Sequence, residues 1–405
     1  MAEQAKVPAI RFAGFTDPWE QRKLGDYVVV STAKNADGRF NKEDVLSVSG
    51  EYGIVNQIAF QGRSFAGSSV LNYGIVNTGD IVYTKSPLNS NPYGIIKVNK
   101  GIPGIVSTLY AVYRPQDNVH TNFIQVYFEQ HERMNNYMHP LVNKGAKNDM
   151  KVTAENALKG VVTFPSREEQ VIISEFFDRL DSLITLHQRK YDKLVVFKKS
   201  MLEKMFPKDG ESVPEIRFAG FTDPWEQRKA SEVFQIVDDR GHPTLPVLSA
   251  TQNQGMIYRD DSGRYIGHDE SNEIGYKRVL PGDFVVHLRS FQGGFAHSQY
   301  EGITSPAYTV FRAKEPTSHS DRFWKHWFMS EHFIAGLSTV TYGIRDGRSI
   351  SVDEFMNTFL AFPAVEEQAA ISRLLDYLDD LITLHQRKLE LLQNIKKSLL
   401  DKMFV

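Results

Sequence analysis

The sequence predicts an α+β protein in which one domain-plus-helix unit occurs twice, as an internal pseudo-twofold repeat. Residues 10–23 and 216–229 both read IRFAGFTDPWEQRK, and LITLHQRK occurs at 183–190 and again at 381–388. A period of about 200 residues is far longer than the roughly 20 to 50 residues of a solenoid repeat. The duplication therefore concerns a whole domain together with a long helix.

The segments between the repeated blocks differ between the copies, yet both predict a compact α+β domain. Short β-branched and aromatic runs bounded by Gly, Asn and Pro indicate strands. We expect strands at 27–30, 80–83, 95–98, 108–113, 233–237, 283–288 and 308–312, and helices at 123–134 and 322–329. Surface loops that simply drifted would also give divergent middles. Identical flanks nevertheless favour shared docking surfaces combined with different binding specificities.

Each copy of IRFAGFTDPWEQRK, called the repeated block below, contains a helix-start signal. Asp17 suits a helix cap, Pro18 the first helical position and Glu20 the third position of a capping box. We therefore expect a short helical turn before the first strand of each domain. Trp19 and Trp225 are interpreted as core anchors rather than ligand platforms.

Two long helices are predicted at 168–205 and 366–403, each with apolar residues that recur every seven positions. Acidic residues crowd the first half of each helix and basic residues the second half. An antiparallel pair would set acidic halves against basic halves, so we expect an antiparallel coiled coil within one chain.

The heptad pattern places two rows of each helix in the predicted seam. The rows are Phe176, Leu183, Lys190, Phe197 and Leu180, His187, Leu194, Met201 in the first helix, and Leu374, Leu381, Lys388, Ile395 and Leu378, His385, Leu392, Leu399 in the second. The two histidines are interpreted as polar seam residues that fix register, not as metal ligands. Further apolar residues lie outside these rows, which predicts that a partner contributes additional helices.

Familiar catalytic motifs are missing from this sequence. There is no Walker A loop, GxGxxG, HExxH or GxSxG motif. The chain has no cysteine, which excludes disulfides, thiolate metal sites and Cys nucleophiles. No apolar run is long enough to span a membrane and no signal sequence is evident, so we expect a cytoplasmic protein. We predict no catalytic residue and no metal site.

The order of these motifs resembles the specificity subunits of type I restriction–modification enzymes. Each variable domain opens with Trp-Glu-Gln-Arg-Lys, and each helix follows a Pro and a Glu-Glu-Gln run, at Pro165 with 168–170 and at Pro363 with 366–368. The loops 145–148 and 343–350 also resemble the family's pre-helix loop. The resemblance covers essentially the whole chain.

The resemblance implies a non-catalytic subunit that reads double-stranded DNA. Each variable domain would be a target recognition domain for one half of a bipartite sequence, while the helices set the spacing and dock two modification subunits. Restriction subunits would complete the complex. S-adenosylmethionine, ATP and Mg would bind to these partners, so no cofactor is expected on this chain. The implied division is 1–165, 166–206, 207–363 and 364–405: first recognition domain, central helix, linker with second recognition domain, and distal helix.

Candidate base-reading residues are polar side chains with paired donors on predicted loops. They are Arg39, Arg63, Lys85, Asn89, Asn91 and Lys147 in the first domain, and Arg259, Arg264, Arg289, Gln292, Arg345 and Arg348 in the second. For helix pairing and partner docking, the candidates are Leu180, Leu183, His187, Leu194, Leu378, Leu381, His385 and Leu392.

Two other functions stay open at this point. One is a self-contained DNA methyltransferase or nuclease with a cryptic site, which binding of S-adenosylmethionine by the isolated chain would favour. The other is a duplicated scaffold that binds only proteins.

Arg289 and Gln292 give the sharpest test of base reading, because Gly293 and Gly294 would allow close approach of the backbone. Replacing Arg289 with Ala should cost about 1–3 kcal/mol of binding and relax recognition in one half-site only. Binding to a panel of DNA sequences checks this prediction. An equal loss on all sequences would indicate a phosphate contact instead.

Overall fold

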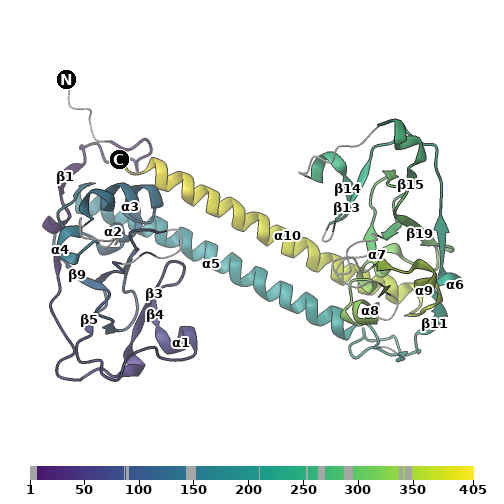
Figure 1. Cartoon of the computed structure of the whole chain (residues 1–405), viewed down its shortest axis with the longest axis horizontal. Helices are drawn as coiled ribbons and strands as arrows, with labels where there is room; N and C mark the ends of the chain where they lie inside the picture. The colour runs from purple at the N-terminus through teal and green to yellow at the C-terminus, as the bar shows by residue number, and fades with distance from the viewer. Residues whose placement is uncertain are drawn as a thin grey trace. The chain divides into compact units, whose positions relative to one another are not determined.

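The computed structural model describes residues 7–85, 87, 91–142, 152–208, 210–251, 254–262, 270–286, 295–336, 341–342 and 349–405. The chain divides into two compact units (Figure 1). The first unit contains residues 1–188 and 387–405, and the second contains residues 189–386. Each unit therefore combines one variable domain with a segment of both long helices. The four-part division made from the sequence stays a prediction.

The first variable domain is built around a four-stranded antiparallel sheet of order β2-β9-β6-β7, with smaller two-stranded sheets beside it. Its strands are β1 (Glu20–Lys23), β2 (Val28–Val30), β3 (Leu46–Ser49), β4 (Gly53–Asn56), β5 (Gly74–Val76), β6 (Ile81–Tyr83), β7 (Ile96–Val98), β8 (Gly104–Val106), β9 (Ala111–Pro115) and β10 (Val161–Phe164). Its helices are α1 (Gln57–Gln61), α2 (Thr121–Tyr127), α3 (His131–Met138) and α4 (Ala154–Ala157), with 3-10 turns η1 (Leu24–Asp26), η2 (Lys42–Asp44) and η3 (His139–Leu141).

The second variable domain repeats this plan with the sheet order β12-β19-β16-β17. Its strands are β11 (Glu226–Lys229), β12 (Phe234–Val237), β13 (Leu248–Thr251), β14 (Gly255–Tyr258), β15 (Lys277–Val279), β16 (Phe284–Val286), β17 (Phe295–His297), β18 (Gly302–Thr304), β19 (Thr309–Ala313), β20 (Thr341–Tyr342), β21 (Ser349–Ile350) and β22 (Phe359–Phe362). Its helices are α6 (Ala230–Val233), α7 (Asp321–Trp327), α8 (Glu331–Gly336) and α9 (Val352–Asn357), with η4 (Arg259–Ser262) and η5 (Glu270–Gly275).

Most predicted elements are present, with one division that the apolar pattern did not reveal. The strands β2, β6, β7, β9, β12, β16 and β19 lie where the sequence predicts them, to within a few residues. The helix predicted at 123–134 is instead two helices, α2 and α3. The side chain of Gln130 accepts a hydrogen bond from the Arg133 backbone N–H and so caps a new helix start.

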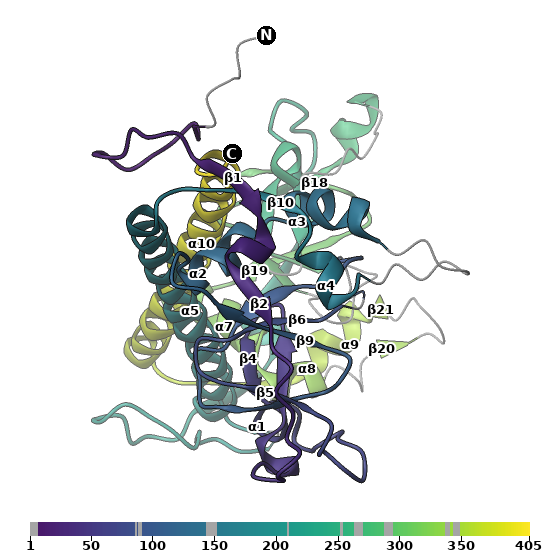
Figure 2. The same ribbon diagram turned by 90° about the vertical axis from the view of Figure 1, so that its left-hand side faces the viewer.

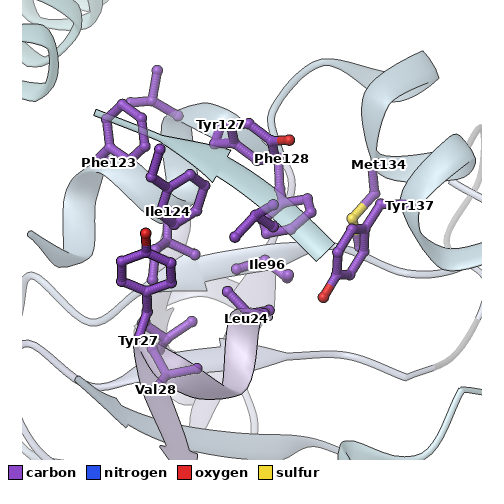
Figure 3. Close-up of a cluster of buried hydrophobic side chains, with 14 of the residues drawn as sticks. Leu24, Tyr27, Val28, Ile96, Phe123, Ile124, Tyr127, Phe128, Met134 and Tyr137 are labelled. Carbon is purple, nitrogen blue, oxygen red and sulfur yellow. The ribbon is translucent and has the colours of Figure 1, made fainter. Parts of the chain in front are cut away.

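The main core of the first unit lies between its four-stranded sheet and the helices α2 and α3 (Figure 3). Phe123 and Tyr127 of α2 pack on Phe164 of β10, with ring centroids 4.9 and 5.0 Å apart. The same core includes Phe177 of the first long helix, so the domain and the helix bury one continuous apolar surface. The second unit has an equivalent core around Phe323 and Trp324.

The long helices α5 (Arg167–Lys204) and α10 (Val365–Lys402) have 38 residues each and agree with the predicted helices. In the first unit, Asp181 of α5 contacts Lys396 of α10, and Phe177 contacts Phe404 just beyond the end of α10. In this direction the residue numbers increase along α5 and decrease along α10. In the second unit, Lys198 of α5 pairs with Asp379 of α10. The predicted antiparallel arrangement is thus confirmed.

The repeated block does not form the predicted helical turn. Glu20 to Lys23 are strand β1, which pairs with β10 (Figure 2). Their copies in β11 pair with β22 in the same register. Trp19 is only 3% exposed and Trp225 2% exposed, as expected for core anchors. The conformation of residues 20–23 is determined by their pairing with β10. A capping signal is local in sequence and gives no information about this pairing.

An ion pair joins each repeated block to the start of a long helix. Arg11 donates two hydrogen bonds of 2.8 and 2.7 Å to the carboxylate of Glu169, which is 0% exposed. Arg217 binds Glu367 with the same two distances. These bidentate pairs are called the Arg–Glu clasps below.

The repeated block also caps the end of the other long helix. The Ile10 N–H donates to the Lys402 carbonyl at 2.9 Å, and the Ile216 N–H donates to the Lys204 carbonyl at 2.8 Å. Each bond satisfies one of the carbonyls that a helix leaves unpaired at its end. Each block therefore holds the beginning of one long helix and the end of the other.

Replacing Arg11 with Ala should lower the free energy of unfolding by about 3–5 kcal/mol, because the buried Glu169 carboxylate would lose its partner. Arg22→Ala is the matched control, since Arg22 pairs with Glu20 on the surface and its loss should cost no more than about 1 kcal/mol. Denaturant unfolding of the full chain measures both values. Equal losses in the two variants would contradict a clasp that stabilises the fold.

Candidate nucleic-acid and partner interface

Two of the predicted DNA-binding arginines lie on exposed loops of the first variable domain. Arg39 lies between β2 and η2, with its guanidinium carbon 5.0 Å from the centre of the Phe40 ring. Arg63 follows α1, with its guanidinium carbon 4.6 Å from the centre of the Phe65 ring. Each aromatic ring supports a planar cation that stays accessible to a ligand.

Polar contacts hold these loops together. Asn35 is 0% exposed, and its side-chain amide donates to the carbonyls of Phe40 and Val70 at 2.8 and 3.4 Å. The Phe65 N–H donates to the side chain of Gln57 in α1 at 2.7 Å. The helix α1, which Arg63 follows, lies at the end of this domain away from β1 (Figure 2).

The remaining candidates differ in their accessibility. Lys85 has a positive φ of 56° and donates from Nζ to the Thr108 carbonyl at 3.1 Å, so its ammonium is already engaged. Asn91 and Arg259 are half-buried, and the Arg259 guanidinium lies 6.0 Å from the Tyr276 ring centre. The other candidates lie outside the described residues: Asn89, Lys147, Arg264, Arg289, Gln292, Arg345 and Arg348.

Sequence reasoning missed three exposed aromatic residues near Arg63. Tyr52 and Phe60 lie with ring centroids 5.4 Å apart, and Phe65 supports the arginine. All three side chains are more than two fifths exposed. Aromatic residues within a Gly-rich, polar segment were the available signal, because exposed aromatic rings are typical of binding surfaces.

The coiled-coil seam differs from its prediction by one residue in one row. The row with Leu180, His187 and Leu194 is inward, as is the row with Leu378, His385 and Leu392; all six are buried or half-buried. The second row was placed one residue too early: Leu183 and Phe197 are each 47% exposed, and Leu381 is half-buried. The inward positions are Phe177, Ile184, Tyr191 and Lys198 in α5, and Leu375, Ile382, Leu389 and Lys396 in α10.

Lysines in the seam explain that error. Lys396 lies 2.6 Å from Asp181 and 2.8 Å from Glu129, and the equivalent Lys198 pairs with Asp379. The aliphatic stem of a lysine covers apolar surface while its ammonium reaches a carboxylate. A pattern of apolar residues alone does not count such a lysine as a seam residue.

Leu183, Phe197 and Ile395 of the displaced row are exposed on the helices, together with other apolar side chains of each unit. In the first unit they are Leu183 and Leu186 of α5 and Leu391 and Ile395 of α10; in the second they are Val195, Val196 and Phe197 of α5 and Tyr377 and Leu384 of α10. We call these two sets the helix stripes. Large apolar side chains left exposed on a helix pair are typical of a surface that binds further protein.

A charged network connects α7 to α10 in the second unit. Asp376 accepts hydrogen bonds from His326 at 2.9 Å and from Lys325 at 3.1 Å. Within the described residues, His326, Asp376 and Asp379 form one group with the ligand spacing of a metal site. The ammonium groups of Lys325 and Lys198 already supply positive charge to both carboxylates, so the arrangement is that of an ion-pair network.

Known proteins similar to this chain belong to one class. Residues 16–195 match the family model described as the type I restriction modification DNA specificity domain. The MjaVIII type I restriction enzyme specificity subunit of Methanocaldococcus jannaschii is 24% identical over 259 residues, which are 59% of this chain and 60% of that protein. This alignment thus spans less than two thirds of that relative's length. A second chain of the same organism, assigned as the MjaX specificity subunit, is 20% identical over 80% of this chain and 77% of its own length.

A solved structure shows the same fold. The crystal structure of the S subunit of a type I restriction–modification system from M. genitalium covers 98% of this chain and 99% of that one, with a TM-score of 0.55 and 11% identity. The fold of this chain is therefore that of the solved S subunit. The resemblance of this chain to type I restriction enzyme specificity subunits is confirmed.

Acid should weaken the second unit through Asp376. Burial opposes its ionisation, but the hydrogen bond from His326 and the charge of Lys325 prevail and lower the pKa of Asp376 to about 2. A lowered pKa contributes stability above the unfolded value near 3.8, and this contribution is lost as pH falls towards 2. Asp376→Asn should cost about 2 kcal/mol at pH 7 and progressively less below pH 4.

Unfolding free energies of the full chain between pH 2 and pH 7 measure this dependence. Burial also lowers the pKa of His326, so the parent and Asp376→Asn should both lose stability below about pH 6.5, where the histidine of the unfolded chain gains its proton. The exposed Asp380→Asn is the control and should stay within about 0.5 kcal/mol of the parent at every pH. A constant deficit of Asp376→Asn across the range would refute the ionic role.

Proposed function

We propose that this chain is the non-catalytic DNA-recognition subunit of a type I restriction–modification complex. Each variable domain reads one half of a bipartite sequence in double-stranded DNA, and the helices set the spacing between the two readers. The observation that carries the proposal is that one structural frame occurs twice, around two different variable domains. By frame we mean the repeated block, its Arg–Glu clasp and the two long helices. A frame held constant while the reading loops change suits two half-sites of different sequence.

The exposed loops of the variable domains contact the bases in this proposal. Arg39 and Arg63 support this assignment, because their guanidinium groups rest on aromatic rings and leave donors for a guanine edge. The segments 263–269, 287–294 and 343–348 carry the remaining proposed readers of the second domain, which stay predictions from the sequence. The two variable domains differ in net charge. Residues 1–165 hold 17 basic and 14 acidic side chains, whereas residues 207–363 hold 16 basic and 21 acidic side chains. We therefore propose that partners supply part of the phosphate contact.

The helix stripes dock the modification subunits in this proposal. Leucine, isoleucine, valine and aromatic side chains on a two-helix pair fit apolar helices of a partner, since two helices alone leave a wide apolar surface uncovered. Leu186 of the first stripe and Leu384 of the second are equivalent positions, 46% and 45% exposed. Ile395 of the first stripe and Phe197 of the second are another equivalent pair, and these two pairs support two copies of the same partner. Restriction subunits then join this assembly.

Catalysis and cofactors belong to the partner subunits in this proposal. S-adenosylmethionine would serve the modification subunits, and ATP with Mg would serve the restriction subunits. The sequence supports this division, because it lacks the phosphate-loop motif that commonly binds ATP with Mg.

Methylome sequencing of cells with and without this chain tests the proposal. We expect methylation of a two-part motif with a fixed non-specific gap only when the chain is present with its modification subunit. Methylation of an unchanged motif without the chain would contradict the proposal. Methylation by the purified chain alone would support the self-contained enzyme instead.

A further inference from the structure

Two aspartates of each long helix are the same in both copies although their neighbours differ. Residues 176–182 of α5 read FFDRLDS, and the equivalent residues 374–380 of α10 read LLDYLDD. The two aspartates and one leucine agree, and burial in the seam explains the leucine. The aspartates are half-buried, at Asp178 and Asp181 in α5 and at Asp376 and Asp379 in α10. A repeated coding sequence does not explain them, because the other residues of this segment have changed.

The second aspartate of each pair joins the two long helices. Asp181 of α5 lies 2.6 Å from Lys396 of α10 in the first unit. Asp379 of α10 pairs with Lys198 of α5 in the second unit. The two aspartates are equivalent and so are the two lysines, so the antiparallel helix pair explains why these residues are constant.

The first aspartate of each pair contacts the variable domain. In the first unit, Asp178 accepts a hydrogen bond of 2.8 Å from Asn122 of α2 and forms an ion pair with Lys100 in the loop after β7. In the second unit, the equivalent Asp376 accepts hydrogen bonds of 2.9 and 3.1 Å from two side chains of α7. We call these contacts of Asp178 and Asp376 with their variable domains the two domain latches.

The donors of the two domain latches come from different positions in their domains. The backbone N–H groups of His120 and Ser320 each donate to a glutamine at the start of a long helix, which makes α2 and α7 equivalent with an offset of 200 residues. Gln125 therefore stands in the first domain where Lys325 stands in the second. The side chain of Gln125 accepts a hydrogen bond of 2.8 Å from the Val98 N–H, so the equivalent position has another role there.

Lys100 of the first latch likewise has a neutral equivalent. The loops after β7 and β17 correspond, because each begins with a backbone N–H that donates to the carbonyl of a buried aspartate, at 2.9 and 2.8 Å. These matched bonds place Gln299 of the second domain where the first domain has Lys100. Gln299 and Asp376 line the same cavity. A cation at position 299 would therefore lie close to the carboxylate that α7 now contacts.

We propose that Asp178 and Asp376 are positioning residues that fix the orientation of each variable domain on the helices, whichever position of the domain supplies the donor. The inference rests on the proposed function, in which the helices set the spacing between two readers. Two charge-assisted hydrogen bonds or ion pairs to one carboxylate are directional and restrict rotation of the domain. A carboxylate that stays constant while its donors move suits any domain attached to the frame.

Gap-length discrimination by the full chain, in complex with its purified modification subunit, tests this inference. DNA duplexes carry the methylated motif with its native gap, or with a gap one base pair longer or shorter. Lys325→Gln with His326→Val gives α7 the residue types of the first domain and removes both donors to Asp376. We expect binding at the native gap to weaken about tenfold, which reduces the preference over the altered gaps at least about fivefold. Base preference within each half-site should stay unchanged.

Adding Gln299→Lys to this variant should restore the gap preference, because it supplies a cation from the position that the first domain uses. Lys100→Gln with Asn122→Ala removes the donors of the first latch and should give the same loss as the α7 variant. This pair replaces no residue of the apolar core, so its result does not depend on whether the α7 variant folds. Lys314→Gln is the matched control, because this lysine donates to the Ser231 carbonyl within the second domain. Its gap preference should be parental.

Parental gap preference in both latch variants would overturn the inference. Equal losses on all three gap lengths would overturn it too, because they would indicate a contribution to folding alone. Failure of Gln299→Lys to restore the preference would overturn the free placement of the donor. A parent complex that does not distinguish the gap lengths would be a different failure, because it would overturn the proposed function itself.

Discussion

The Arg–Glu clasp is the interaction on which the rest of the structure depends. A carboxylate at the start of each long helix is fully buried and tolerates burial only with a bidentate partner. Arg11 and Arg217 supply that partner from the repeated block. Because the same block also accepts the end of the other helix, one short sequence fixes where both helices meet each domain.

Aromatic packing completes this junction in both units. Phe404, just beyond α10, contacts Trp19 in the first unit, and Phe206, just beyond α5, contacts Trp225 in the second. Each helix end thus enters the core of the domain whose block caps it. The frame constrains few positions of the variable domains, which explains how their sheets keep one topology while their loops diverge. Function on this account lies in those loops, and assembly lies in the frame.

Repeats, helix bounds and antiparallel pairing could be predicted from the sequence, because identity and charge order are visible along the chain. The seam register could be predicted only in part. Three apolar rows compete in each helix, and Lys198 and Lys396 take inward positions through ion pairs with residues distant in sequence. The strand conformation of β1 could not be predicted either, because it depends on pairing with β10, which is distant in sequence. Exposed loop arginines were identifiable, whereas the aromatic rings that support Arg39 and Arg63 required the structure.

The most direct test of this account is exchange of one variable domain within the constant frame. Residues 24–160 are replaced by residues 230–358, and the methylome of cells that carry the chimera is sequenced. The account predicts that one half of the methylated motif is retained and the other half is replaced. Loss of both halves, or a motif unchanged by the exchange, would contradict independent reading by two domains held in one repeated frame.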